Sequence, residues 1–282
     1  MVDLNNLKKP YFIGEIGINH NGDLNIVKKL MDAVYACGWD CAKFQKRNPD
    51  VCVPEHQKNI KRSTPWGEMT YLDYKYKVEF ESEEYNFINQ YAQNKPIDWT
   101  ASVWDLDSLE FLSNFDVPFI KIPSALITEI DLVEETAKTG KQVIMSTGMS
   151  TIEEIDNAYN TIDKFGKKPI VMHTNSSYPT KRDELNLNNI TMLKDRYKCT
   201  VGYSGHEPDL EPTVIAVSLG AMVIERHITI SHNLWGTDQG ASLEISGMDI
   251  LIKRCQDITL MRGSYDKIVT ESELPIRTKL RG

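Results

Sequence analysis

Short runs of apolar and β-branched residues alternate along the chain with segments in which apolar residues recur every three or four positions. The first pattern predicts strands and the second predicts amphipathic helices. In one such helix Ile26, Leu30 and Val34 share a face, whereas Lys28 and Asp32 lie off it. Several strand-like runs are apolar on both faces, which is typical of buried parallel strands. The eight predicted strands are 11–18, 41–45, 99–103, 119–122, 142–146, 169–173, 200–203 and 222–227.

Helical segments follow these strands, and Gly38, Gly140 and Gly220 stand where three of them should end. Eight strand–helix units in 282 residues favour a single-domain TIM (β/α)8 barrel, of the α/β class, over an open doubly wound sheet. No Gly-x-Gly-x-x-Gly follows a strand, so dinucleotide binding lacks its main support. The predicted helices are 23–36, 83–94, 106–114, 129–139, 151–165, 188–196, 209–219 and 246–261.

Two regions depart from this alternation. Residues 48–80 form a long polar stretch, rich in Lys, Tyr and Pro, directly after the second strand. Long segments at this end of a barrel strand are often functional, so we interpret 48–80 as a lid. We expect the barrel domain to cover residues 1–262 and residues 263–282 to form a C-terminal tail.

Composition and charge narrow the classes of function. The chain is 41% hydrophobic and 26% charged, as soluble globular proteins are. Its formal net charge of -8 argues against nucleic-acid binding, but a few local lysines could still bind an anionic substrate. No apolar run approaches the roughly 20 residues of a membrane span, and the first residues lack a signal-peptide core. The five scattered cysteines favour a reducing compartment. We therefore expect a cytoplasmic protein without nucleic-acid or membrane partners.

Two histidines, His206 and His227, end the last two predicted strands. Strand ends of a βαβ unit point into the same mouth, where both imidazoles could share one metal ion. The alternative is that both are hydrogen-bonded histidines near a sheet edge.

Other polar residues gather at the predicted strand ends, where the active sites of TIM barrels lie. Lys43 and Lys121 stand inside otherwise apolar strands, a costly placement unless each ammonium group faces an anion. Together with nearby hydroxyls they predict a pocket for a carboxylate and a phosphate. Glu15 and Asp238 are candidate proton-transfer groups. The remaining polar residues at these ends are Asn19, His20, Asn21, Gln45, Ser102, Ser124, Ser146, Thr147, Asn175, Ser176, Tyr178 and Ser204.

Eight motifs, in this order across nearly the whole chain, resemble those of the sialic acid (nonulosonic acid) synthase family. They are GEIGINHNG at 14–22, AKFQ at 42–45, KIPS at 121–124, STGM at 146–149, SYP at 177–179, GYSGH at 202–206, ERH at 225–227 and DQGASLE at 238–244. Each motif alone is weak, but eight in order are specific.

The resemblance implies condensation of phosphoenolpyruvate with an open-chain sugar aldehyde similar to N-acetylmannosamine, giving a 2-keto-3-deoxy nonulosonic acid and phosphate by C–O cleavage. It also implies a divalent metal, usually Mn²⁺ with Mg²⁺ or Co²⁺ as alternatives, and a homodimer. By this resemblance His206 and His227 would be the metal ligands. The catalytic residues would be Glu15, Lys43, Lys121 and Asp238, and the substrate-binding residues Gln45, Ser102, Ser124, Ser146, Ser176, Tyr178 and Ser204.

The chain departs from the family pattern at two places. Ala125-Leu126 stands where the family commonly has Gly-Glu, so the acceptor can differ from N-acetylmannosamine. Residues 271–277 resemble the linker to an antifreeze-like domain, which in longer members supplies an arginine to the partner's sugar site. The chain ends at Gly282, so we expect another group, such as one from the lid, to replace that arginine at the sugar site.

Three other functions stay open. One is a phosphoenolpyruvate–aldose synthase that makes an eight- or seven-carbon keto-deoxy sugar acid. The second is a non-catalytic barrel that acts as a partner in a surface-glycan pathway. The third is a metal-dependent hydrolase, which usually needs a further carboxylate or histidine ligand.

Overall fold

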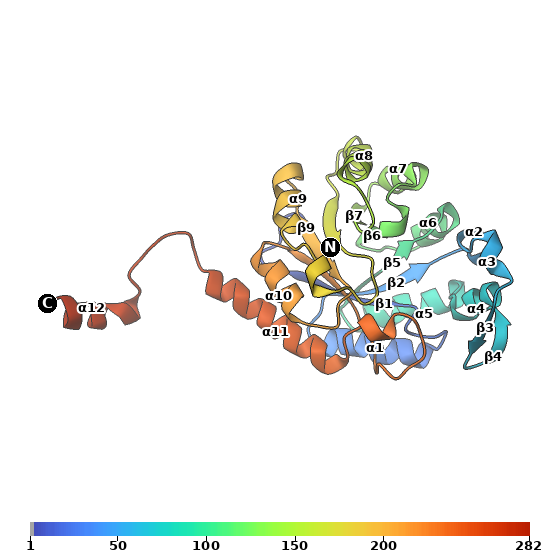
Figure 1. Cartoon of the computed structure of the whole chain (residues 1–282), viewed down its shortest axis with the longest axis horizontal. Helices are drawn as coiled ribbons and strands as arrows, with labels where there is room; N and C mark the ends of the chain where they lie inside the picture. Colours follow the sequence, from blue (N-terminus) through green and yellow to red (C-terminus); the bar gives the residue numbers. More distant parts are fainter. Residues whose placement is uncertain (1–2) are drawn as a thin grey trace.

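The computed structural model, which describes residues 3–282, contains a closed barrel of eight parallel strands (Figure 1). This confirms the predicted single-domain TIM barrel, and each predicted strand is present with ends that differ by at most two residues. Around the barrel the order is β1-β10-β9-β8-β7-β6-β5-β2. The strands are β1 Tyr11–Gly17, β2 Cys41–Lys46, β5 Asp98–Val103, β6 Phe119–Ile122, β7 Gln142–Ser146, β8 Ile170–Thr174, β9 Val201–Gly205 and β10 Val223–His227.

Helices surround the strands, as the apolar periodicity predicted. In α1 Leu30 and Val34 are fully buried, and Asp23 caps its N-terminus by accepting from the Asn25 backbone N–H. Thr151 and Glu154 form a capping box at the start of α8. The helices are α1 Leu24–Ala36, α5 Ser82–Gln93, α6 Leu106–Ser113, α7 Ile130–Lys138, α8 Ile152–Asp163, α9 Asn189–Tyr197, α10 Glu211–Ser218 and α11 Ile245–Arg262.

The interior of the barrel changes from apolar to polar along the strands. Side chains alternate across a strand, so every second residue points inward. The lower interior is an apolar cluster to which Ile13, Cys41, Phe119 and Val223 belong. Two residues further along the same four strands stand Glu15, Lys43, Lys121 and Glu225. The apolar half therefore closes the barrel from below, and the polar half forms the floor of a site at the C-terminal face.

Residues 48–80 are folded rather than an irregular loop, and they lie at one side of the barrel (Figure 1). They contain an antiparallel hairpin and three helices, two of which have only four residues and therefore no periodic signal. Lys46 holds the base of this segment, because its Nζ contacts Glu79 Oε1 at 3.1 Å and donates to the Phe80 carbonyl at 2.8 Å. The elements are α2 Pro49–Cys52, α3 Glu55–Lys58, β3 Lys61–Thr64, β4 Gly67–Thr70 and α4 Tyr71–Val78.

The C-terminal segment extends away from the barrel (Figure 1). It holds a 3-10 turn, Glu271–Glu273, and a last helix, α12 Leu274–Arg281, in which every residue is exposed. Its interpretation as a linker stays a prediction. Over residues 3–282 no helix is both long and apolar enough to cross a membrane.

Candidate active site

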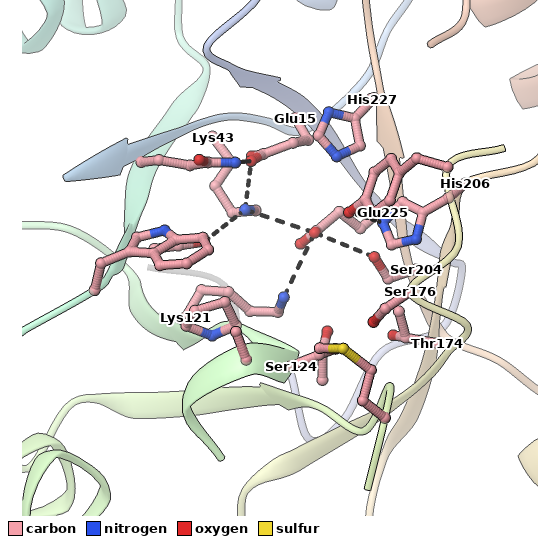
Figure 2. Close-up of a pocket in the computed structure, with 18 residues that line it drawn as sticks. Glu15, Lys43, Lys121, Ser124, Thr174, Ser176, Ser204, His206, Glu225 and His227 are labelled. Carbon is pink, nitrogen blue, oxygen red and sulfur yellow. Dashed lines mark hydrogen bonds and ion pairs between the residues drawn. The ribbon is translucent and has the colours of Figure 1, made fainter. Parts of the chain in front are cut away.

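All eight barrel strands contribute to one cavity at the C-terminal face (Figure 2). Every catalytic, substrate-binding or metal-binding residue that the family resemblance implied lines it except Asp238, whereas Asn19, His20, Asn21, Thr147 and Asn175 lie outside its wall. The lining residues are Glu15, Lys43, Gln45, Ser102, Trp104, Lys121, Pro123, Ser124, Ala125, Ser146, Met149, Thr174, Ser176, Tyr178, Ser204, His206, Glu225 and His227.

The floor of the cavity is a buried cluster of four charges: Glu15, Lys43, Lys121 and Glu225, which we call the inner cluster. Lys43 Nζ lies 2.6 Å from Glu15 Oε2 and donates to Ser102 Oγ at 2.8 Å. The ammonium groups of Lys43 and Lys121 each lie 3.5 Å from Glu225 Oε1 (Figure 2). Register explains the proximity, since Glu15 pairs with Lys43. Lys43 uses its donors on protein groups, whereas Lys121 has donors left for a ligand.

The charges of the inner cluster shift one another's pKa values. Burial alone would raise the pKa of Glu225, but Lys121 and Lys43 outweigh it, and the pKa lies below its usual value. Burial lowers the pKa of Lys121, and the charge of Lys43 adds to this effect. For Lys43 burial also acts to lower the pKa, yet Glu15 and Glu225 prevail and raise it. Glu225 is therefore held as a carboxylate, and the two lysines differ in how fully protein groups compensate their charge.

One wall of the cavity is a cradle of hydroxyls. The Gly148 N–H donates to Ser124 Oγ at 3.0 Å. A Cβ at Gly148 would lie 2.2 Å from Ser176 Oγ and 2.9 Å from Ser124 Oγ, so only glycine leaves this space open. Ser146 Oγ is buried and has no hydrogen-bond partner in the described part of the chain. Hydroxyl and backbone N–H groups around a gap next to Lys121 suit a phosphate or carboxylate.

The two histidines lie together on the opposite side, with ring centroids 5.5 Å apart. His206 Nδ1 lies 2.6 Å from the Asn175 carbonyl, and its Nε2 lies 2.8 Å from the Tyr178 hydroxyl. The Nδ1 must therefore carry the proton, and Nε2 accepts from Tyr178. Burial lowers the pKa of His206 to about 3, and His227 acts in the same direction. A neutral imidazole whose Nε2 carries the lone pair suits a metal ligand, and a metal bound there would replace the hydrogen bond from Tyr178.

Asp238 lies behind His227, with its Oδ2 3.9 Å from His227 Nδ1, rather than on the cavity wall. The Asn-His-Asn motif after β1 holds this region in place. Asn19 Nδ2 donates to the Ile228 carbonyl at 2.9 Å, and Asn21 Nδ2 to the Trp235 carbonyl at 2.9 Å. The motif therefore positions the loop that carries Asp238 and contributes nothing to the cavity wall.

The sequence analysis did not single out Glu225, Thr174, Trp104 or Met149 as site residues, although all four line the cavity. Glu225 stands two positions before His227 on β10, so alternation alone puts both side chains on the inner face. This alternation could therefore have identified Glu225 as a site residue from the sequence alone. At the departure from the family pattern, Ala125 lines the cavity, whereas Leu126 lines an adjoining groove.

A closed barrel with a charged floor, a hydroxyl cradle and two adjacent histidines defines a class of enzyme that binds small anions at its C-terminal face. The chain belongs to the NeuB family, whose model matches residues 30–267. Members of this family are phosphoenolpyruvate-dependent condensing synthases of nonulosonic acid biosynthesis, so the chain is a transferase of that kind. The family resemblance inferred from the sequence motifs is thereby confirmed.

Relatives and solved structures agree with this assignment. The chain is 34% identical to the N,N'-diacetyllegionaminic acid synthase of Campylobacter jejuni, over 95% of this chain and 81% of the relative. It is 33% identical to the N-acetylneuraminate-9-phosphate synthase of Homo sapiens, over 96% of this chain and 76% of the relative. It superposes on the N-acetylneuraminic acid synthetase of Leptospira borgpetersenii with a TM-score of 0.87 and 30% identity, covering 98% of this chain and 93% of that one.

Proposed function

We propose that the chain condenses phosphoenolpyruvate with an open-chain hexosamine aldehyde, giving a nine-carbon 2-keto-3-deoxy sugar acid and inorganic phosphate. The observation that carries this proposal is the inner cluster, in which two buried ammonium groups bracket the Glu225 carboxylate beneath a hydroxyl cradle. The relatives are named as synthases of N,N'-diacetyllegionaminic acid, N-acetylneuraminate-9-phosphate and pseudaminic acid, which supports a nonulosonic acid product.

Lys121 is the group best suited to the phosphate of phosphoenolpyruvate. Its only acidic neighbour within ion-pair distance in residues 3–282 is Glu225, at 3.5 Å and shared with Lys43. Ser124, Ser146 and Ser176 add donors beside it. Lys43 and Lys121 share the single negative charge of Glu225, so a dianionic ligand would supply the counter-charge that Lys121 lacks.

The reaction then follows from the electron flow. The C2=C3 π pair of phosphoenolpyruvate bonds C3 to the aldehyde carbon, and the aldehyde oxygen takes a proton, for which the Tyr178 hydroxyl is a suitable donor. The positive charge left at C2 is stabilised by a nearby carboxylate such as Glu15. Water adds at C2 and loses a proton to a carboxylate. The C2 hydroxyl then gives up its proton, which the departing phosphate can take, and its electron pair forms the C2=O bond as the C2–O bond to phosphate breaks; Lys121 stabilises the departing charge.

We further propose that His206 and His227 hold a divalent metal, Mn²⁺ in the first instance with Mg²⁺ or Co²⁺ as alternatives. The fit rests on the Asn175 carbonyl, which fixes the His206 tautomer and leaves Nε2 as a basic nitrogen. Residues 3–282 contain no group of three or more His, Cys, Asp or Glu side chains suited to a metal. The site would therefore depend on substrate oxygens and water for its other ligands. When bound, such a metal polarises an aldehyde oxygen as a Lewis acid.

Release of phosphate tests the reaction. The protein is mixed with Mn²⁺, phosphoenolpyruvate and a panel of hexosamines, hexoses and pentoses, and free phosphate and product mass are measured. The proposal expects release only when a sugar is present, with a nine-carbon product. An eight- or seven-carbon product would select the alternative synthases, and release without any sugar would contradict condensation.

Metal binding is tested without relying on activity. Equilibrium dialysis with Mn²⁺ should give one site per chain, which is lost in His206→Ala and His227→Ala while the thermal unfolding profile is kept. Undiminished Mn²⁺ binding by either variant would remove the histidines as ligands.

We also propose that residues 48–80 cover the sugar end of the cavity and that two chains form a homodimer. The lid follows β2, the strand of Lys43 and Gln45, and its end is fixed to β2 through Lys46. Sedimentation equilibrium would give the oligomeric state directly. A monomer at assay concentrations that is fully active would remove the dimer from the account.

A further inference from the structure

Three cations of the lid region, Arg47, Arg62 and Lys75, have no carboxylate within ion-pair distance among the residues that the structure describes. Their neighbour Lys46 differs, since it contacts both Glu79 and Glu81. Like charges held close together are unfavourable unless an anion joins them. The arrangement therefore requires an explanation beyond the folding of the lid.

Arg47 lies at the rim of the cavity. Its guanidinium stacks on the Trp104 ring at 4.0 Å and donates to Gln45 Oε1. Both Trp104 and Gln45 line the cavity. The stacking fixes the guanidinium plane, and a fixed planar fork of donors is the geometry that binds phosphate through two hydrogen bonds.

Arg62 and Lys75 both lie close to the ring of Tyr71. The Arg62 guanidinium is 4.0 Å from the Tyr71 ring centre, and Lys75 Nζ is 5.2 Å from it. The same ammonium lies 5.4 Å from the Tyr74 ring, and Tyr74 packs edge-on against Trp235 at 5.1 Å. Trp235 belongs to the loop that carries Asp238, so this part of the lid packs against the loop next to His227.

The electrostatics agree with this placement. Burial, together with the charges of Arg47 and Arg62, lowers the pKa of Lys75 to about 8, while Asp238 and Glu79 act in the opposite direction. These charges therefore lie close enough to act on Lys75. Glu79 is already paired with Lys46, so Asp238 is the carboxylate left to oppose three cations, and the cluster carries excess positive charge.

We propose that Arg47, Arg62 and Lys75 form an anion subsite for the acceptor, which is then a sugar aldehyde carrying a phosphate monoester at the end remote from its aldehyde. This inference rests on the proposed function, because it names the class of acceptor for the same cavity. The aldehyde end lies toward His206 and His227, and the phosphate end lies under the lid. A neutral sugar would leave the three cations without a counter-charge.

The test compares matched pairs of acceptors. N-acetylmannosamine, N-acetylglucosamine and mannose are each supplied with and without a 6-phosphate, and kcat/KM is measured by disappearance of phosphoenolpyruvate. The wild-type protein should prefer the phosphorylated member of the reactive pair by about 100-fold, the size typical of a buried charge pair. Arg47→Met and Lys75→Met should each reduce that ratio at least tenfold.

Lys77→Met is the matched control, because Lys77 is an exposed cation on the same helix, 5.8 Å from the Trp66 ring. Its preference ratio should equal that of the wild type. Equal use of both members of a pair by the wild type, or a preference for the neutral sugar, overturns the subsite while the condensation stands. If no acceptor of any pair consumes phosphoenolpyruvate, the proposed function fails together with the subsite.

Discussion

Two consecutive residues of β10, Glu225 and Arg226, belong to two buried charge clusters on opposite faces of the same sheet. Glu225 points into the barrel and joins the inner cluster. Arg226 points outward beneath the helices, where its Nη1 lies 3.1 Å from Glu207 Oε1 with both side chains fully buried. Both clusters bear the cost of removing ions from water, yet only the inner one borders a cavity.

The outer cluster, Tyr203, Glu207 and Arg226, is compensated by the protein itself. Arg226 Nη1 donates to the Asp209 carbonyl at 3.0 Å and to Thr213 Oγ1 at 2.9 Å, and the Tyr203 hydroxyl donates to Glu207 Oε2 at 2.8 Å. Each cluster keeps a buried polar atom without a partner within residues 3–282, Glu225 Oε2 in the inner cluster and Arg226 Nε in the outer one. The clusters differ in position: Glu225 lines the cavity, where a ligand can reach it, whereas Arg226 and Glu207 are enclosed beneath the helices and hold the fold.

The largest effect is expected from Lys43→Met, which removes the central cation of the inner cluster. Glu15 would lose its 2.6 Å partner, and Glu225 would keep only Lys121. We expect a loss of stability of about 3–5 kcal/mol, because a buried carboxylate is left uncompensated. Activity should fall by about 1,000-fold or more. Urea unfolding measures the stability, and phosphate release measures the activity. Near-wild-type values of both would show that Lys43 is needed neither for the fold nor for catalysis.

Arg226→Met should act on stability alone. Removing the guanidinium leaves Glu207 buried without a cation, for an expected loss of about 3–5 kcal/mol in urea unfolding. The folded fraction should still bind phosphoenolpyruvate as the wild type does. Adding Glu207→Gln should recover part of the lost stability, since the uncompensated charge is then gone. Weakened phosphoenolpyruvate binding in Arg226→Met would show that the two clusters are not separable.

The fold and most of the cavity could be predicted because they follow from periodicity. The alternation of strand-like and helix-like segments predicted the barrel, and the position of Lys43, Lys121 and the two histidines near strand ends predicted that they lie at its C-terminal face. The lid elements were missed, since helices of four residues such as α2 and α3 have no periodic signal. The cluster of Arg47, Arg62 and Lys75 was missed for another reason: aromatic stacking across the lid, rather than sequence spacing, brings these side chains together.

Gly148→Ala should have an intermediate effect within the hydroxyl cradle. The new Cβ would lie 2.2 Å from Ser176 Oγ and 2.9 Å from Ser124 Oγ, so the hydroxyls must move. We expect the KM for phosphoenolpyruvate to rise by about 10- to 100-fold, in line with the usual cost of overpacking. Gly240→Ala is a suitable control, since a Cβ there would meet no atom within 4 Å. An unchanged KM in Gly148→Ala would place the anion elsewhere.

The smallest effect concerns pH. The pKa of Lys75 is lowered to about 8 by burial and by two arginines, so its charge is lost as pH rises through about 8. The kcat/KM for an anionic acceptor, which reports the free enzyme, should fall several-fold between about pH 7 and 9. Lys75→Arg keeps its charge and should show a flatter profile. A fall of equal size in that variant would assign the titration to another group. The groups facing Lys75 are Arg47, Arg62, Tyr71, Tyr74, Glu79 and Asp238.

The most direct test of the comparison is calorimetric binding of phosphoenolpyruvate to the wild type and to Lys121→Met. Lys121 is 2% exposed, and Glu225 keeps Lys43 when Lys121 is removed, so the fold should persist. The account predicts binding weaker by about 30- to 1,000-fold in a variant with an unchanged unfolding profile. Equal affinity for phosphoenolpyruvate in the two proteins would contradict the claim that the inner cluster is the anion-binding floor of the active site.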